Sequence, residues 1–337
     1  MARPAYLPDN FTLTLATTVA LASLLPAAGA AAPFFEALTT LSIGLLFFMH
    51  GAKLSREAIL AGIGHWRLHL LVLASTFALF PVLGLVLKPV LAPLVTPALY
   101  TGVLYLCVLP STVQSSIAFT SIARGNIPAA VCSASASTLL GVFITPVLAN
   151  LLVVPQHGVA GPSALDAIGR ILLQLMAPFV AGHLLRPWIA GWIKRHSSVL
   201  GKVDRSSILL VVYTAFSAAV IEGLWKQVPL RALAGLLVVC AVLLALALLS
   251  STWLARRLGF GKADEITIVF CGSKKSLASG VPMAKVLFAA PSVGAILLPI
   301  MLFHQMQLMV CAVLAQRYAR RPEEEGGPPV KPRAAKA

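Results

Sequence analysis

Two adjacent lysines, Lys274 and Lys275, stand inside a stretch that is otherwise apolar enough to lie in a lipid bilayer. An ionisable group at the centre of a transmembrane helix costs about 2.5–3.5 kcal/mol on insertion scales, so such groups usually face a protein interior or a wet cavity. Gly272 and Pro282 flank the pair and predict a helix that is broken at membrane depth. The stretch 270–282 is therefore the first candidate for a binding site.

Three interpretations of the lysine pair are open. The ammonium groups bind an anionic substrate as point charges, or they fill the place of a coupling cation, or one of them extends to a membrane interface. Because successive residues of a helix diverge by about 100°, both lysines face one cavity only where the backbone is unwound. A buried lysine also loses its proton readily, which would permit proton coupling.

A second polar cluster, residues 110–116, lies in another apolar segment. It holds four hydroxyl groups and one amide, and Pro110 is expected to unwind the preceding turn. Hydroxyls and unwound carbonyls are oxygen ligands that suit small cations or polar substrate groups. Helix packing is the competing explanation for each single serine, but the cluster on a broken helix favours a site.

The composition indicates a polytopic membrane protein. Hydrophobic residues make up 58% of the 337 residues and charged residues only 11%, with a mean hydropathy of +0.90. The formal net charge of +15 lies in short clusters between apolar runs, as the positive-inside rule predicts, so we expect no nucleic-acid partner. Five cysteines are scattered one per apolar segment, so neither a disulfide framework nor a zinc site is expected. Nucleotide-binding, hydrolase and metalloprotease motifs are absent, so we expect no enzyme activity.

Apolar runs of about 20 residues, the length that crosses roughly 30 Å of hydrocarbon, predict ten transmembrane helices. Lysines and arginines concentrate in alternate connections, which predicts two cytoplasmic termini. A cleaved signal peptide is the less favoured alternative for the first run. Residues 317–337 are basic and proline-rich, and we expect a disordered cytoplasmic tail there. The ten predicted spans are 11–31, 35–51, 67–88, 97–122, 127–153, 165–185, 206–224, 230–255, 264–289 and 293–316.

Ten spans divide into five plus five, and an odd number in each half inverts the second half relative to the first. Residues 114–118 match residues 274–278 at a shift of 160. The match falls on spans 4 and 9, the two interrupted ones, where inverted-repeat transporters place substrate and ion sites. We therefore predict two inverted five-helix repeats in which the interrupted spans 4 and 9 are equivalent.

Span 5 follows a helix-start signal. Asn126 and Pro128 suit an N-cap and a first helical turn. Serines three or four residues apart share a helix face, and alternate serines do not. Ser133 and Ser135 are both candidate ligands, although at most two of the hydroxyls in 133–138 can point the same way.

Four stretches carry motifs that resemble those of the bile acid:sodium symporter family, in particular its YfeH-like bacterial branch. The similarity covers nearly all of the membrane region. Its more specific parts are Ala-Arg-Gly-Asn at the end of span 4 and Ser-Lys-Lys-Ser in span 9. The four stretches are 46–55, 75–81, 109–126 and 270–282.

The resemblance implies one transporter unit over residues 1–316. It implies a panel domain of spans 1, 2, 6 and 7 and a core domain of spans 3–5 and 8–10, in which the broken spans 4 and 9 cross. Alternating access would come from the motion of one domain against the other. The two lysines in a broken helix predict a small organic anion as the substrate, and the resemblance to a bacterial branch implies the bacterial inner membrane as the location. Two alternatives of other classes are a non-transporting membrane regulator or scaffold, and a cation/proton antiporter.

The resemblance also implies a sodium site, formed by hydroxyl and amide ligands of spans 4 and 5 and by an acidic residue with a glutamine in span 9. Ser115 and Ser116 match the first set and would lie near the ion. The span-5 positions fall on alanines, the acidic position falls on Phe270, and Lys274 and Lys275 replace a glutamine-asparagine pair. Two ammonium groups repel sodium, so we expect transport without sodium coupling, with sodium or a proton as the alternative coupling ion and no other cofactor.

The candidate residues share a polar side chain close to one of the expected helix breaks. His304, Gln305 and Gln307 of span 10 are assigned to helix packing instead. The candidate substrate- and ion-binding residues are Thr76, Ser111, Thr112, Gln114, Ser115, Ser116, Ser133, Ser135, Ser273, Lys274, Lys275 and Ser276.

Overall fold

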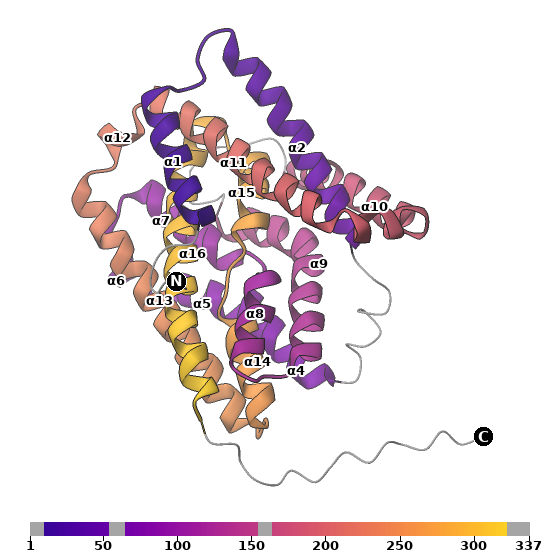
Figure 1. Ribbon diagram of the computed structural model, residues 1–337. Helices are drawn as coiled ribbons and strands as arrows, with labels where there is room; N and C mark the ends of the chain where they lie inside the picture. Colours follow the sequence, from indigo (N-terminus) through magenta and orange to yellow (C-terminus); the bar gives the residue numbers. More distant parts are fainter. Residues whose placement is uncertain (1–9, 54–64, 154–163, 322–337) are drawn as a thin grey trace.

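The computed structural model describes residues 10–53, 65–153 and 164–321, and all regular secondary structure in these ranges is helical (Figure 1). Six of the helices are long and apolar enough to cross a membrane. The chain is therefore a polytopic all-α membrane protein, as predicted. The six are Ala31–Lys53, Trp66–Val86, Ile127–Leu152, Ser197–Ile221, Leu230–Arg257 and Ser292–Ala319.

Within the described residues, the helices are accompanied by a π-helical segment, η2, and a 3-10 turn, η3. In order they are α1 (Asn10–Leu24), α2 (Ala31–Lys53), α4 (Trp66–Ala74), η2 (Ser75–Leu79), α5 (Phe80–Val86), α6 (Lys88–Leu91), η3 (Ala92–Leu94), α7 (Pro97–Val108), α8 (Gln114–Ile122), α9 (Ile127–Leu152), α10 (Ala164–Arg195), α11 (Ser197–Ile221), α12 (Leu224–Gln227), α13 (Leu230–Arg257), α14 (Lys262–Gly272), α15 (Leu277–Leu287) and α16 (Ala290–Ala319).

Several helix ends differ from the predicted ones. The predicted first span ran to residue 31, but α1 ends at Leu24, because Pro26 cannot continue the helical hydrogen bonding and Gly29 turns the chain with a φ of 57°. Conversely, α10 extends to Arg195 and α16 to Ala319, beyond the predicted ends at 185 and 316. Residues 322–337, which hold most of the expected tail, lie outside the described residues.

Both predicted helix interruptions are present. The first separates α7, which ends at Val108, from α8, which begins at Gln114. The second separates α14, which ends at Gly272, from α15, which begins at Leu277. The two helix ends are 164 residues apart and the two helix starts 163 apart, so the predicted register of 160 is wrong. A five-residue match of small and polar side chains was too short to set the register: Gln114 opens a helix, whereas Lys274 lies inside a break.

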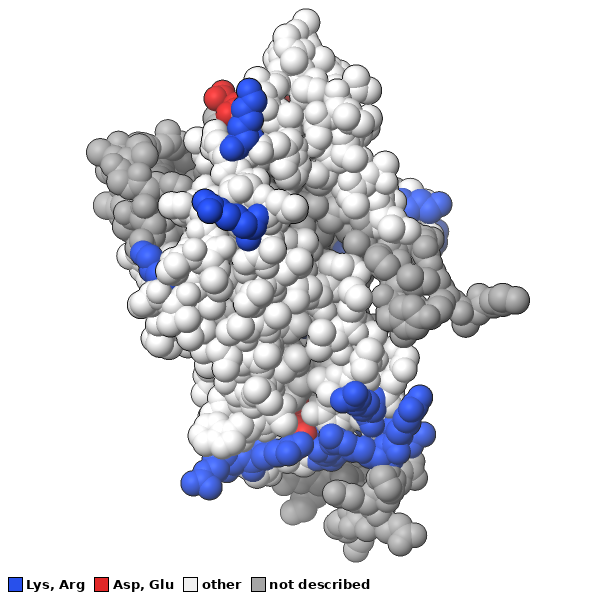
Figure 2. Space-filling model, turned by 90° about the vertical axis from the view of Figure 1, so that its left-hand side faces the viewer, with Lys and Arg blue, Asp and Glu red and all other residues white. Residues whose placement is uncertain are grey.

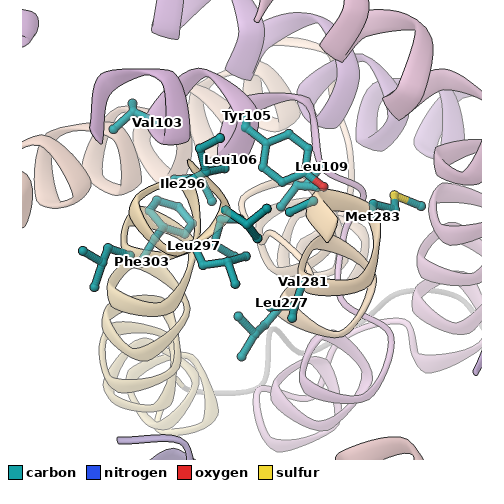
Figure 3. Packing of buried hydrophobic residues seen from close by; sticks show 14 of the residues in the cluster. Val103, Tyr105, Leu106, Leu109, Leu277, Val281, Met283, Ile296, Leu297 and Phe303 are labelled. Carbon is teal, nitrogen blue, oxygen red and sulfur yellow. The ribbon is translucent and has the colours of Figure 1, made fainter. Parts of the chain in front are cut away.

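Apolar side chains of α7, α15 and α16 pack together around these breaks (Figure 3). Tyr105 of α7 also donates a hydrogen bond from its hydroxyl to the Gly280 carbonyl of α15, at 2.8 Å. All five cysteines are buried and free in the structure. Dense packing of this kind holds the unwound segments in one arrangement.

The α2 and α10 helices cross at very short range through two glycines. A Cβ atom added to Gly51 would lie 1.9 Å from the Phe179 carbonyl oxygen, and one added to Gly182 would lie 1.9 Å from the Phe48 carbonyl oxygen. Only residues without a side chain allow backbones to approach so closely. α11 contacts both α1 and α2, so these four helices form one packed group (Figure 1).

Charged residues are unevenly distributed over the surface. On the face shown in Figure 2, lysines and arginines gather at the lower end, a largely uncharged band lies above them, and a few charged residues lie in the upper half. The ends of α13 and α16 lie there, with Arg256, Arg257, Arg317, Arg320 and Arg321 exposed. Large apolar side chains are exposed elsewhere on the helices, as a lipid-facing surface requires.

Candidate functional site

The two helix breaks meet and form hydrogen bonds with each other. The Ser276 N–H donates to the Pro110 carbonyl at 2.9 Å, and the Ser111 hydroxyl donates to the Cys271 carbonyl at 2.6 Å. Each unwound segment thereby supplies partners for backbone groups that the other leaves free. This crossing is the candidate functional site, because irregular backbone at membrane depth persists only where it is buried in protein or lines a cavity.

The carbonyl groups before the first break illustrate how complete this pairing is. Pro110 has no N–H, and the Ser111 N–H binds the Ser137 hydroxyl at 3.0 Å, so the usual helical donors are missing. Every carbonyl from Leu106 to Pro110 nevertheless has a donor. The pairs are Leu106 O with Leu109 N, Cys107 O with Lys275 Nζ, Val108 O with Thr145 Oγ1, Leu109 O with Lys275 Nζ, and Pro110 O with Ser276 N.

Lys275 binds three backbone carbonyls at once. Its Nζ atom lies 2.7 Å from the Thr76 oxygen, 2.8 Å from the Cys107 oxygen and 2.8 Å from the Leu109 oxygen. It also lies 4.2 Å from the centre of the Phe80 ring. Three acceptors match the three N–H donors of an ammonium group, so in this conformation none is left for a substrate.

The Thr76 carbonyl is available because of the π-helical segment η2. In an α-helix it would accept from the Phe80 N–H, but that N–H donates to the Ser75 carbonyl instead. The next residue is Pro81, which has no N–H to offer. The backbone thus presents the Thr76 oxygen to Lys275 without breaking the helix.

Lys274 has a different environment from its neighbour. Its Nζ atom donates to the Ser115 carbonyl at 2.9 Å and lies 3.9 Å from the centre of the Phe119 ring and 5.4 Å from that of Phe270. The two ammonium groups therefore point to separate partners and do not share one cavity. Both lysines are at most 1% exposed, so the interpretation that one of them extends to an interface is wrong.

Gln307 of α16 holds the backbone of Lys275. Its Oε1 accepts from the Lys275 N–H at 2.9 Å, and its Nε2 donates to the Lys275 carbonyl at 2.9 Å. Nε2 also lies 2.9 Å from His304 Nδ1. Sequence reasoning assigned Gln307 to general helix packing, because one glutamine in an apolar run has no spacing signal that identifies its partner.

The span-4 hydroxyls interact mostly with one another and with the second break. Thr112 Oγ1 lies 2.6 Å from Ser115 Oγ and 3.2 Å from Ser116 Oγ, and Ser116 donates to the Phe270 carbonyl at 3.0 Å. Gln114, by contrast, is exposed at the start of α8. The hydroxyl groups of the predicted cluster 110–116 therefore lie together at the crossing, whereas the Gln114 amide does not.

The other predicted hydroxyls bind nearby groups. Thr76 donates back to the Val72 carbonyl and Ser273 to the Val269 carbonyl, so Thr76 contributes to the crossing through its carbonyl and not its side chain. Ser276 caps α15 by accepting from a backbone N–H three residues on, at 3.2 Å.

The span-5 serines confirm the helix-face argument. Ser133 lies 2.7 Å from His69 Nδ1, and Ser137, four residues later, binds the first break as described. Ser135 is half-buried and lies off this face. The helix starts as predicted, because Asn126 caps it by accepting from the Ala129 N–H at 3.1 Å.

A narrow pocket, too small to hold a water molecule in this conformation, lies beside the crossing, between α2 on one side and α9 and α15 on the other. Three of its residues carry polar groups that sequence reasoning missed. His50 Nδ1 lies 2.7 Å from the Leu46 carbonyl, which makes Nδ1 the protonated nitrogen and leaves Nε2 as an acceptor in the neutral ring. The pocket is lined by Leu46, Phe47, His50, Thr138, Val142 and Ser279.

A helical membrane protein with two broken helices that bond to each other at a crossing has the construction of a membrane transporter. Comparison with known families agrees, since the model of the SBF-like CPA transporter family matches residues 9–320. The chain belongs to this family.

Individual relatives support the same assignment. The chain is 68% identical over 324 residues to an uncharacterized protein of Pseudomonas aeruginosa, which covers 96% of this chain and 97% of that protein. It is 60% identical over 319 residues to the Escherichia coli protein named "Putative symporter YfeH", with 94% of each chain covered. The rat "Sodium/bile acid cotransporter 7" is 27% identical over 277 residues, 81% of each chain. The resemblance inferred from the motifs is confirmed, and the family and these named relatives are transporters and not enzymes.

Proposed function

We propose that the protein is a secondary transporter that moves a small organic anion across the bacterial inner membrane by alternating access, without sodium coupling. The crossing of the two helix breaks carries this proposal, because it places two buried ammonium groups where the backbone is unwound. Unwound, charged positions at membrane depth are typical of transport sites.

We propose ten membrane crossings in two inverted repeats. Five are α1, α2, the continuous run from α4 to α5, the broken pair α7 and α8, and α9; the other five are α10, α11, α13, the broken pair α14 and α15, and α16. α1, α2, α10 and α11 would form the panel domain, and the contacts of α2 with α10 and α11 and of α1 with α11 support this grouping. The remaining helices would form the core domain.

The narrow pocket is the proposed substrate site, because it lies between α2 of the panel and α9 and α15 of the core. Apolar walls with a few polar groups suit an organic molecule with a polar head. Ser279 belongs to the first turn of α15, where the helix dipole favours negative charge. Together with the two buried lysines of the adjacent break, this favours an anion. Entry of such a molecule requires α2 to move away from α9 and α15.

Sodium coupling is disfavoured by the position of Lys274. A sodium ion near Ser115 or Ser116 would lie beside the Lys274 ammonium group, which binds the Ser115 carbonyl. At about 4 Å and an effective dielectric constant of 20, two such charges repel by about 4 kcal/mol. A bound sodium ion would therefore be expelled unless the lysine moved or lost its proton.

Transport assays with purified protein in proteoliposomes test the proposal. Uptake of taurocholate and of a panel of small carboxylates is measured with an inward sodium gradient and with a choline gradient of the same ionic strength. We expect at least one anion to enter equally fast under both conditions. Uptake that requires sodium would contradict the coupling proposal, and the absence of uptake of every anion by folded protein would contradict the transport proposal.

A pair of variants on α9 tests the pocket in the same assay. Thr138→Trp places a bulky side chain between α2 and α9, and uptake by the folded variant is expected to fall at least 10-fold. Leu140→Trp places the same side chain on the exposed surface of the helix, where Leu140 is 36% exposed, and is expected to leave uptake unchanged. Equal uptake by both variants would remove the pocket from the mechanism.

A further inference from the structure

We propose that the carbonyl oxygens of Thr76, Cys107 and Leu109 form a cation site which the Lys275 ammonium group fills permanently from within the chain. The inference rests on the proposed function, since it names what takes the place of a mobile coupling ion at the crossing. The proposed site consists of backbone oxygens, so we infer that it would exist without the Lys275 side chain.

The oxygens converge on one point from three separate places. One comes from η2, one from the last turn of α7 and one from the first break, at 2.7, 2.8 and 2.8 Å from Lys275 Nζ. The Phe80 ring adds an aromatic face at 4.2 Å. Converging carbonyl oxygens replace the hydration shell of small monovalent cations, and an aromatic face attracts cations as well.

The lysine does not create this arrangement of oxygens. The Thr76 oxygen is free because the Phe80 N–H binds Ser75 and residue 81 is a proline. The Cys107 oxygen is free because the Ser111 N–H binds a hydroxyl of α9. The backbone therefore leaves the Thr76 and Cys107 carbonyls without helical donors, and they need donors or a cation from elsewhere in the fold.

Residue 275 is anchored so that its charge cannot leave the site. Gln307 binds both its N–H and its carbonyl group at 2.9 Å, and the side chain is 1% exposed. The charge therefore stays with the protein through a transport cycle, unlike an ion that is bound and released. Lys274 does not have this role, because its ammonium group has one carbonyl partner and two aromatic rings.

Chemical rescue of a truncated lysine tests the site without any transport assay. Lys275→Ala removes a propylammonium-sized group, and the thermal stability of the purified variant is measured with propylammonium chloride and with tetramethylammonium chloride at equal ionic strength. Propylammonium has three N–H donors and tetramethylammonium has none. We expect the variant to melt several degrees below the wild type and to be restabilised by propylammonium alone.

Lys274→Ala is the matched control, and a clearly smaller response is expected there. Equal responses of the two variants, or no preference for propylammonium in Lys275→Ala, would overturn the proposal. If Lys275→Ala is recovered unfolded, propylammonium is added during extraction, and recovery of folded protein supports the site. If propylammonium does not restore folded Lys275→Ala protein although Lys275→Met folds, the proposal of a cation site is overturned.

Wild-type protein provides a test that does not depend on any variant. Its melting temperature is measured in sodium chloride and in choline chloride at equal ionic strength. The same temperature in both salts is expected, because Lys275 already fills the site. A sodium-dependent increase would show that a mobile cation still binds at the crossing and would overturn the proposal. Loss of transport activity affects none of these readouts, so this inference and the proposed function can fail separately.

Discussion

Lys275 is a buried charge whose hydrogen-bond donors are all used by backbone carbonyls. Burying an ionised group without partners is prohibitively costly, and removing one partner of such a group leaves an unsatisfied polar atom that costs about 1–3 kcal/mol. Here three carbonyls stabilise the ammonium group, and Gln307 fixes the backbone that carries it. At the residue scale, the site depends on matched donors and acceptors more than on net charge.

Substitution of Gln307 measures how much these hydrogen bonds contribute to the stability of the protein. Gln307→Ala removes both partners of the Lys275 peptide groups, and we expect the free energy of unfolding to fall by about 2–4 kcal/mol. Gln316→Ala, an exposed position on the same helix, is expected to change it by less than about 0.5 kcal/mol. Denaturant unfolding in detergent compares the two, and equal stabilities would mean that the glutamine does not support the break.

Different local features of the backbone interrupt the regular helical hydrogen bonding at the crossing. Pro110 removes a donor and ends α7, whereas η2 shifts the hydrogen-bond register without ending its helix. The second break has no proline between Gly272 and Leu277, and its backbone is held by Gln307 and by the first break. At the element scale, the broken helices therefore depend on each other for their geometry.

The crossing of α2 and α10 gives a prediction about another pair of elements. Gly51→Ala places a methyl group against the Phe179 carbonyl, so the helices must separate, and we expect a destabilisation of about 1–3 kcal/mol. Gly44→Ala, on the same helix, meets open space and is expected to be neutral or to stabilise by up to about 1 kcal/mol. Thermal unfolding of both variants provides the measurement. A neutral Gly51→Ala would show that the two backbones are not in close contact.

On the face shown in Figure 2, lysines and arginines gather at one end of the molecule, where α13 and α16 end with exposed arginines. A positive charge bias of this kind sets the orientation of a membrane protein, with the basic end in the cytoplasm. The uncharged band beside it provides the lipid-facing surface. At the scale of the whole molecule we therefore predict, from the distribution of charge, that the basic end faces the cytoplasm.

Labelling of single cysteines in spheroplasts tests that orientation. We expect Lys226→Cys, at an exposed position of α12, to react with a membrane-impermeant maleimide from outside. Arg257→Cys, at the end of α13, is expected to react only after the membrane is permeabilised. The five native cysteines are buried, which limits the background. The reverse pattern would place the basic end outside.

Much of the fold could be predicted because lipid restricts what a chain can do. Long apolar runs must form helices, and prolines, glycines and hydroxyls within them indicated where two of these helices break. The predicted helix ends and the predicted repeat register were less accurate. Pro26 and Gly29 end α1 early, and a five-residue similarity did not identify equivalent positions. The pocket residues His50, Thr138 and Ser279 were missed, because they come from three helices and share no local pattern.

The sequence alone determined that this protein crosses the membrane many times, that it belongs to a transporter family and that Lys274 and Lys275 lie in a broken helix. Those properties follow from hydrophobicity, backbone chemistry and motifs, which are local. Only the tertiary structure decided what the lysines bind. Lys275 binds carbonyls contributed by residues 76, 107 and 109, and Lys274 binds the carbonyl of Ser115. Carbonyl groups are common to every residue, so only the folded backbone can decide which of them are free and where they converge.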